Sequence, residues 1–139
     1  MSAVQVRALS GTPGPTKPMN VSTRARTGDN VVIGGFIIQG QTTKKVIVRA
    51  IGPTLAQFGV SGVLADPVLD LFDHTGLVIA HNDNWRSSQE QEIINTNLAP
   101  PDDRESAVVA TLQPGNYTAV ITGANNSTGV TLIEMYDLP

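Results

Sequence analysis

Residues 66–85 read DPVLDLFDHTGLVIAHNDNW, and they give the clearest indication of the fold. It holds two short runs of β-forming residues, Val68–Asp73 and Leu77–His81, separated by the turn sequence Asp-His-Thr-Gly. Two such runs joined by a few turn residues that include glycine are typical of a β-hairpin. The stretch closes on Asn-Asp-Asn-Trp at residues 82–85, where polar side chains meet the only tryptophan of the chain.

The rest of the chain repeats this pattern of short β-forming runs separated by turn residues. The pattern predicts an all-β fold, an antiparallel β-sandwich of the jelly-roll or immunoglobulin-like type. Beyond the hairpin, the strands expected are Val31–Ile38, Lys45–Ile51, Ala107–Leu112, Asn116–Thr122 and Val130–Asp137. The first and last of these are apolar on both faces. We therefore expect their second face to be covered either by a helix and long loops or by another subunit.

One short helix is predicted between the hairpin and residue 107. Ser87 followed by Glu90 matches a capping box, and Pro100 marks the end of the helix. Ile93, Ile94 and Leu98 supply an apolar side for packing on a sheet. A single helical turn is also expected around Thr54–Phe58.

The N-terminus is organised differently from the rest of the chain. Residues 1–9 include a short strand in which Val4, Val6 and Ala8 alternate with other side chains, and residues 10–18 contain three prolines and two glycines. This composition predicts a detached strand on a semi-rigid linker, before a sandwich domain at residues 19–139. The strand is a frayed tail or an edge strand of its own domain, or it is donated to the next subunit.

Composition excludes several classes of protein. The chain has 139 residues, of which 40% are apolar and 15% charged, and it has no cysteine. Disulfide scaffolds and thiolate metal sites are therefore excluded. The net charge of −3 argues against nucleic-acid binding, and no apolar run is long enough to span a membrane. Residues 2–9 do not have the pattern of a secretion signal. Enzyme motifs are absent, so we expect no catalytic activity.

The charge is unevenly distributed along the chain. Residues 1–65 carry seven basic and one acidic side chain, whereas residues 66–105 carry two basic and nine acidic ones. This asymmetry is either ordinary surface scatter or a sign that a basic end of one copy meets an acidic end of another, because complementary charges steer association.

Acidic and amide side chains gather in two loops. Counting outward from the hairpin turn places Asp66 opposite residue 83 or 84, and like charges opposed across a ladder are destabilising. Carboxylate and amide oxygens are the ligands that Ca²⁺ prefers, so these loops predict a calcium site unless they are unliganded turns. We expect the helix to return the second loop towards the first. The candidate ligands are Asp66, Asn82, Asp83, Asn84, Asp102, Asp103 and Glu105.

Two family resemblances support this interpretation. The pieces LDLFDHTGLVIAHNDNW and LQPGNYTAVITG resemble bacterial pre-peptidase C-terminal domains, which are small secreted β-sandwiches that bind calcium. The longer pattern of NVSTRARTGDNVVIGGFII, RAIGPTL, DPVLDLFDHTG, NDNW and PDDRESAVVATLQPGNYTAVITG is similar to a sandwich domain of bacterial secreted and surface proteins, whose caltubin-like members form calcium-stabilised tubes. That resemblance implies calcium at Asp66, Asn82, Asp83 and the 102–105 loop, and head-to-tail assembly.

These observations predict an extracellular or cell-surface structural subunit rather than an enzyme. We expect it to assemble with copies of itself into calcium-stabilised filaments or tubes, with Val4, Val6 and Ala8 of one copy filling a groove in the next. The alternative is a monomeric calcium-binding accessory module that recognises carbohydrate or a protein partner.

Overall fold

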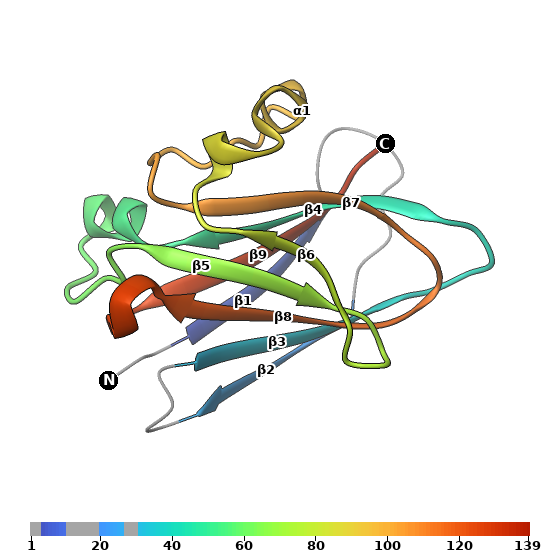
Figure 1. Cartoon of the computed structure of the whole chain (residues 1–139), viewed down its shortest axis with the longest axis horizontal. Coiled ribbons are helices and arrows are strands. Elements are labelled where there is room, and N and C mark those ends of the chain that lie inside the picture. The colour runs from blue at the N-terminus through green and yellow to red at the C-terminus, as the bar shows by residue number, and fades with distance from the viewer. Residues whose placement is uncertain (1–3, 11–19, 27–30) are drawn as a thin grey trace.

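Two sheets packed face to face form the protein (Figure 1), whose computed structural model describes residues 4–10, 20–26 and 31–139. Sheet A has the strand order β1-β9-β4-β7, and sheet B has the order β2-β3-β8-β5-β6. Every pairing is antiparallel except that of β1 with β9. This confirms the predicted all-β sandwich. The strands are β1 Val4–Ser10, β2 Asn20–Arg26, β3 Val31–Ile38, β4 Lys44–Ile51, β5 Pro67–Phe72, β6 Val78–Asn82, β7 Ser106–Leu112, β8 Gly115–Gly123 and β9 Thr131–Asp137.

The core lies between the two sheets and is built from alternate residues of their strands. Phe36, Leu71 and Ile121 of sheet B meet Val48 and other apolar side chains of sheet A, and all of them are buried. Successive residues of a strand point to opposite faces, so each strand gives every second side chain to this layer. Burying one such side chain contributes about 1.5–3 kcal/mol, and this layer is the main source of stability.

The β5–β6 hairpin forms as predicted. The Oδ1 atom of Asp73 accepts hydrogen bonds from the backbone nitrogens of Thr75 and Leu77, at 2.9 and 3.2 Å. The Thr75 hydroxyl donates to the same carboxylate, and these bonds lower the pKa of Asp73. Gly76 has a φ of 85°, a left-handed conformation that glycine adopts without strain.

The helical segments differ from the prediction in detail. The expected turn is the 3₁₀ segment η1 Pro53–Phe58, and the expected helix is preceded by a second one, η2 Trp85–Ser87. The helix α1 spans only Glu90–Asn95, and Gln89 rather than Ser87 precedes it without a side-chain cap. The predicted capping box is therefore wrong, because the Ser87 hydroxyl is bound to the Asn84 carbonyl at 2.6 Å. A further 3₁₀ segment is η3 Ala124–Asn126.

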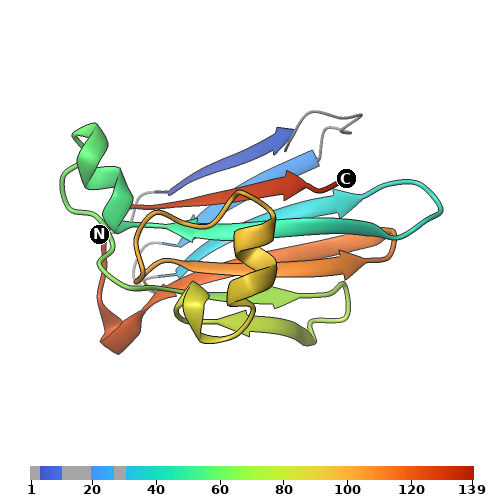
Figure 2. The same cartoon turned by 90° about the horizontal axis from the view of Figure 1, so that it is seen from above.

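The two sheets differ in what covers their outer faces. Helix α1 and η2 lie over sheet A, where Ile47, Trp85 and Ile93 form a second buried cluster (Figures 1 and 2). No helix of the described chain crosses the outer face of sheet B, and Ile37 of β3 remains 40% exposed there. The second apolar face of β9 is thus covered within the chain, whereas that of β3 is only partly covered.

The N-terminal strand lies beside its own domain. β1 pairs in parallel with β9, from Val4 opposite Thr131 to Ser10 opposite Asp137. This is the edge-strand alternative that the sequence left open. The linker predicted at residues 10–18 lies, from residue 11 on, outside the described residues. Strand β2, which the pattern of the sequence does not predict, follows and pairs with β3 at the edge of sheet B.

Candidate functional site

The two acidic loops meet at one end of the sandwich. The backbone nitrogen of Trp85 donates to the carbonyl of Glu105 at 2.9 Å, so the loop after α1 returns to the loop before it as predicted. Arg86 strengthens this contact, since its Nε lies 2.7 Å from Oδ1 of Asp103. The predicted ligands therefore share one region of the molecule, but they do not share one role.

Asp66 and Asp83 form the centre of the site. Their carboxyl groups interact directly, and the Oδ1 atom of each is buried without a hydrogen-bond partner. Burial and the neighbouring Asp83 raise the pKa of Asp66, while the charge of Arg104 lowers it. Two ionised carboxylates in this position repel each other, and their buried oxygens have lost water without gaining a donor.

Asp102 and Asp103 are neutralised by arginines instead. Arg104 binds Asp102 through Nε and Nη2, at 3.0 and 3.1 Å, and this pairing lowers the pKa of Asp102. Asp103 pairs with Arg86, whose guanidinium also lies 4.2 Å from the centre of the Trp85 ring. Since each of these aspartates has a cation partner, neither needs a metal to balance its charge.

Glu105 has a structural role that its sequence position did not indicate. Its side chain is fully buried, and Oε2 accepts hydrogen bonds from the backbone nitrogens of Gly52 and Thr54, both at 2.9 Å. Oε1 accepts from the Thr54 hydroxyl at 2.7 Å and from the Asp102 nitrogen at 3.1 Å. With four donors already bound, this carboxylate ties η1 to the acidic loop rather than facing a ligand.

Asn82 and Gln89 protect the free edge of β7. The Asn82 Oδ1 atom accepts from the nitrogen of Ala107 at 3.1 Å. The Gln89 side chain accepts from the nitrogen of Val109 at 3.0 Å and donates to its carbonyl at 2.9 Å. The Asn82 Nδ2 atom donates to the Asn84 carbonyl and to a serine hydroxyl, so the Asn82 amide is fully used within the chain.

Replacing Asn82 with alanine should therefore destabilise the protein with or without calcium. The change leaves the buried nitrogen of Ala107 without an acceptor, which costs about 1–3 kcal/mol. The free energy of unfolding, measured by urea titration in calcium and in chelator, should fall equally in both. A loss seen only in calcium would instead identify Asn82 as a ligand.

The Asp66–Asp83 pair fits a cation. Two adjacent anionic groups with unpaired buried oxygens are stabilised by a divalent ion, and hard oxygen donors suit Ca²⁺. Within residues 31–139, no group of three or more acidic or histidine side chains is close enough to hold a metal. An ion at this pair would therefore complete its shell with carbonyl, amide or water oxygens. Ca²⁺ would supply positive charge and rigidity here, not chemistry.

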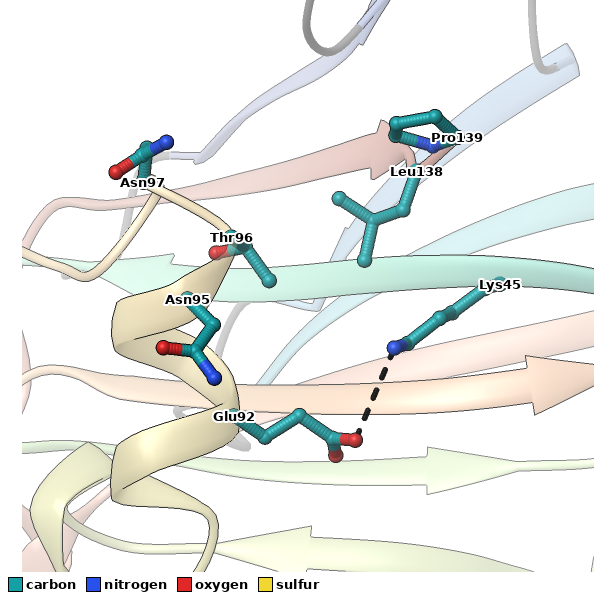
Figure 3. A pocket seen from close by; sticks show the side chains of 7 residues that line it. All are labelled: Lys45, Glu92, Asn95, Thr96, Asn97, Leu138 and Pro139. Carbon is teal, nitrogen blue, oxygen red and sulfur yellow. Dashed lines mark ion pairs between the residues drawn. The ribbon is translucent and has the colours of Figure 1, made fainter.

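A separate open pocket lies between α1 and the C-terminal end of β9 (Figure 3). It has a volume of about 490 Å³ and contains Lys45 and Glu92, whose charged groups lie 3.8 Å apart. The rest of its lining is Asn95, Thr96, Asn97, Leu138 and Pro139. No aromatic side chain lines this pocket, so it has no surface on which a sugar ring could stack. The only tryptophan, Trp85, is 3% exposed and offers no such surface either.

Comparison with known proteins supports the class of fold. No family model and no curated protein matches the chain. Among solved structures, it is similar to the pre-peptidase C-terminal domain of a collagenase from Bacillus anthracis, with a TM-score of 0.50. The alignment covers 97% of this chain and 96% of that one at 9% identity.

The similarity defines a class of β-sandwich and assigns no residue. It confirms the part of the predicted resemblance that concerns the fold, while tube formation and calcium binding stay predictions. In the described part of the chain, no helix has the length and apolarity needed to span a bilayer.

Proposed function

We propose that this chain is an extracellular structural subunit that assembles with copies of itself and is stabilised by Ca²⁺ at Asp66 and Asp83. The observation that carries the proposal is the pair of buried carboxylate oxygens without partners. A bound ion removes the repulsion between the two side chains and fixes the two loops that meet at this end of the sandwich. No catalytic role is assigned to any residue.

Exchange of β1 between copies is the proposed mode of assembly. Among the described strands β1 pairs only with β9, and residues 11–19 separate it from β2. The same parallel backbone pairing can be made with β9 of a neighbouring copy, with no change in hydrogen bonds, as in domain swapping. In this arrangement Val4, Val6 and Ala8 remain the side chains proposed to fill the groove of the neighbour.

Truncation of residues 1–10 tests the exchange. We expect the full chain to form polymers in calcium, visible by negative-stain microscopy, and the truncated chain to stay at low mass. The truncated chain must first show a cooperative unfolding transition, which separates loss of assembly from loss of fold. Polymers formed by a folded truncated chain would contradict strand exchange, and polymers unaffected by chelator would contradict the role of calcium.

One observation favours a second candidate function, a monomeric module that binds a small polar ligand or a protein. The pocket that contains Lys45 and Glu92 offers opposite charges and amide groups at an open surface (Figure 3). Light scattering distinguishes the two functions, because a monomeric module stays near 14.7 kDa in calcium at every concentration.

A further inference from the structure

Strand β6 is an open edge of sheet B, and its pairing with β5 is irregular between Leu71 and Phe72. Among the described strands, β6 ends the sheet and has a neighbour on one side only. Leu77, Val78 and Ile79, at and just before its start, are 63%, 47% and 40% exposed, three consecutive apolar residues in contact with solvent. Edge strands are normally protected by lysine, proline or a covering segment, and β6 contains neither of these residues.

The adjacent edge of sheet A, strand β7, is protected by side chains that bind its backbone. Side-chain amides of Asn82 and Gln89 bind the backbone of β7 at Ala107 and Val109. Within residues 31–139, no side chain binds the backbone of β6 in this way. This side of the sandwich therefore presents one closed and one open strand, and the open strand can pair with a partner that supplies backbone donors and acceptors.

The two edges of sheet B differ in the charge of the residues in or next to them. That edge is β2, whose register places Arg24 beside Ile33 and Arg26 beside Val31. Next to β6, by contrast, lie Asp70, which pairs with His81 at 2.6 Å, and Asp73 of the hairpin turn. Sheet B thus carries basic residues in one edge strand and carboxylates next to the other, and such a pattern favours contact between the two ends of different copies.

We propose that β6 of one copy pairs with β2 of a second copy, so that sheet B continues from copy to copy. Four antiparallel pairings separate β2 from β6, so the two strands run in the same direction. A second copy in the same orientation then forms a parallel pair, the geometry that β1 and β9 already show. Because this contact joins two different surfaces, it generates rings or filaments rather than closed dimers.

The inference rests on the self-assembly proposed above, but it requires neither calcium nor exchange of β1. Replacement of Ile79 with lysine places a charge on the open edge, and replacement of Ile94 on α1 is its matched control, because both side chains are 40% exposed. Sedimentation should show that I79K weakens association at least tenfold, while I94K has no effect. Association should also weaken as salt is raised, since the contact is charge-complementary.

Cysteine cross-linking identifies the strands that meet. The chain has no cysteine, so single cysteines can be placed in β2 as Ser22→Cys or in β6 as Val78→Cys. We expect oxidation of a mixture of the two variants to give a disulfide between β2 and β6. Rapid cross-linking of Val78→Cys alone would show a symmetric β6–β6 contact and overturn the proposal, as would equal masses for I79K and I94K.

Truncation of residues 1–10 separates this inference from the proposed strand exchange. If assembly needs residues 1–10 but is unchanged by I79K, strand exchange stands and the β6–β2 contact is wrong. If a folded truncated chain still assembles and I79K prevents it, the β6–β2 contact stands and strand exchange is wrong. A full chain that stays monomeric and gives no β2–β6 cross-link overturns the inference directly.

Discussion

Replacement of Glu105 with alanine should lower the free energy of unfolding by about 3–5 kcal/mol, because it removes the acceptor for four donors at once. Two of those donors are backbone nitrogens of residues 52 and 54, and the truncation leaves them unpaired in a buried position. Single domains are stable by about 5–15 kcal/mol, so this one change removes a large part of the total. Urea unfolding followed by tryptophan fluorescence measures it.

A graded pair of variants shows whether hydrogen bonding is the cause. Glu105→Gln keeps an acceptor for the two backbone nitrogens, but its NH₂ group faces the nitrogen of Asp102, which is also a donor. The free energy of unfolding that it loses should therefore lie between zero and the loss caused by alanine. Glu92→Ala is the control. Glu92 is half-exposed, and its ion pair with Lys45 is long, at 3.8 Å, so its removal should change the free energy of unfolding by less than about 1 kcal/mol. Equal losses for Glu105→Gln and Glu105→Ala would refute the explanation.

Local signals in the sequence were sufficient to predict most strands. The alternation of residues and the turn chemistry around Asp73 and Gly76 lie within a few positions of each other, and β3, β5, β6 and β8 appear within two residues of their predicted ends. Strand β2 is not predicted because Asn20–Arg26 is mostly polar, with Val21 and Ala25 as its only apolar residues. The capping box at Ser87 is wrong because the Ser87 hydroxyl donates to the Asn84 carbonyl and the helix begins only after Gln89, which is bound to β7. A local motif indicates neither contact.

The sequence predicted that the two acidic loops meet, but not which of their side chains are bound within the chain. Acidic and amide residues gather where the sequence placed them, yet Glu105 is bound by residues 51 and 53 positions earlier and Asn82 by a residue 25 positions later. A short motif cannot indicate backbone donors that lie so far away in the sequence. Among the seven candidates, only Asp66 and Asp83 keep unpaired buried oxygens. Counting from the hairpin turn brings Asp66 close to residue 83 or 84, but it does not show that the other candidates are bound within the chain.

The Asp66–Asp83 pair should make stability depend strongly on calcium. An ion that binds only the folded state stabilises it by about 2.7 kcal/mol when its concentration is a hundred times the dissociation constant. Asp83→Asn should lose most of this gain, because one of the two anionic ligands is gone. In chelator the same variant should be more stable than the natural chain, by up to about 1 kcal/mol, since it relieves the repulsion between the two carboxylates.

The specific result expected is that Asp83→Asn is less stable than the natural chain in calcium but more stable than it in chelator. Asp103→Asn is the matched control, since Asp103 is exposed and paired with Arg86, and it should leave the calcium-induced gain intact. Thermal unfolding in calcium and in chelator measures both variants. A natural chain whose melting temperature is the same in millimolar calcium and in chelator would contradict a calcium site at this pair.

Acid should reproduce part of the effect of calcium. Because the pKa of Asp66 is raised in the folded state, the folded chain takes up this proton at higher pH than the unfolded chain. Asp66 therefore destabilises the fold above its folded pKa, and this penalty is removed as the pH falls below the ordinary value of about 3.9. Asp73 and Asp102 have lowered pKa values and act in the opposite direction, so the total free energy of unfolding does not isolate the effect of Asp66.

The difference in free energy of unfolding between Asp66→Asn and the natural chain does isolate the effect of Asp66. In chelator, the advantage of the variant should be greatest at neutral pH and should disappear in acid, whereas an advantage independent of pH would show that the carboxylate of Asp66 carries no electrostatic penalty.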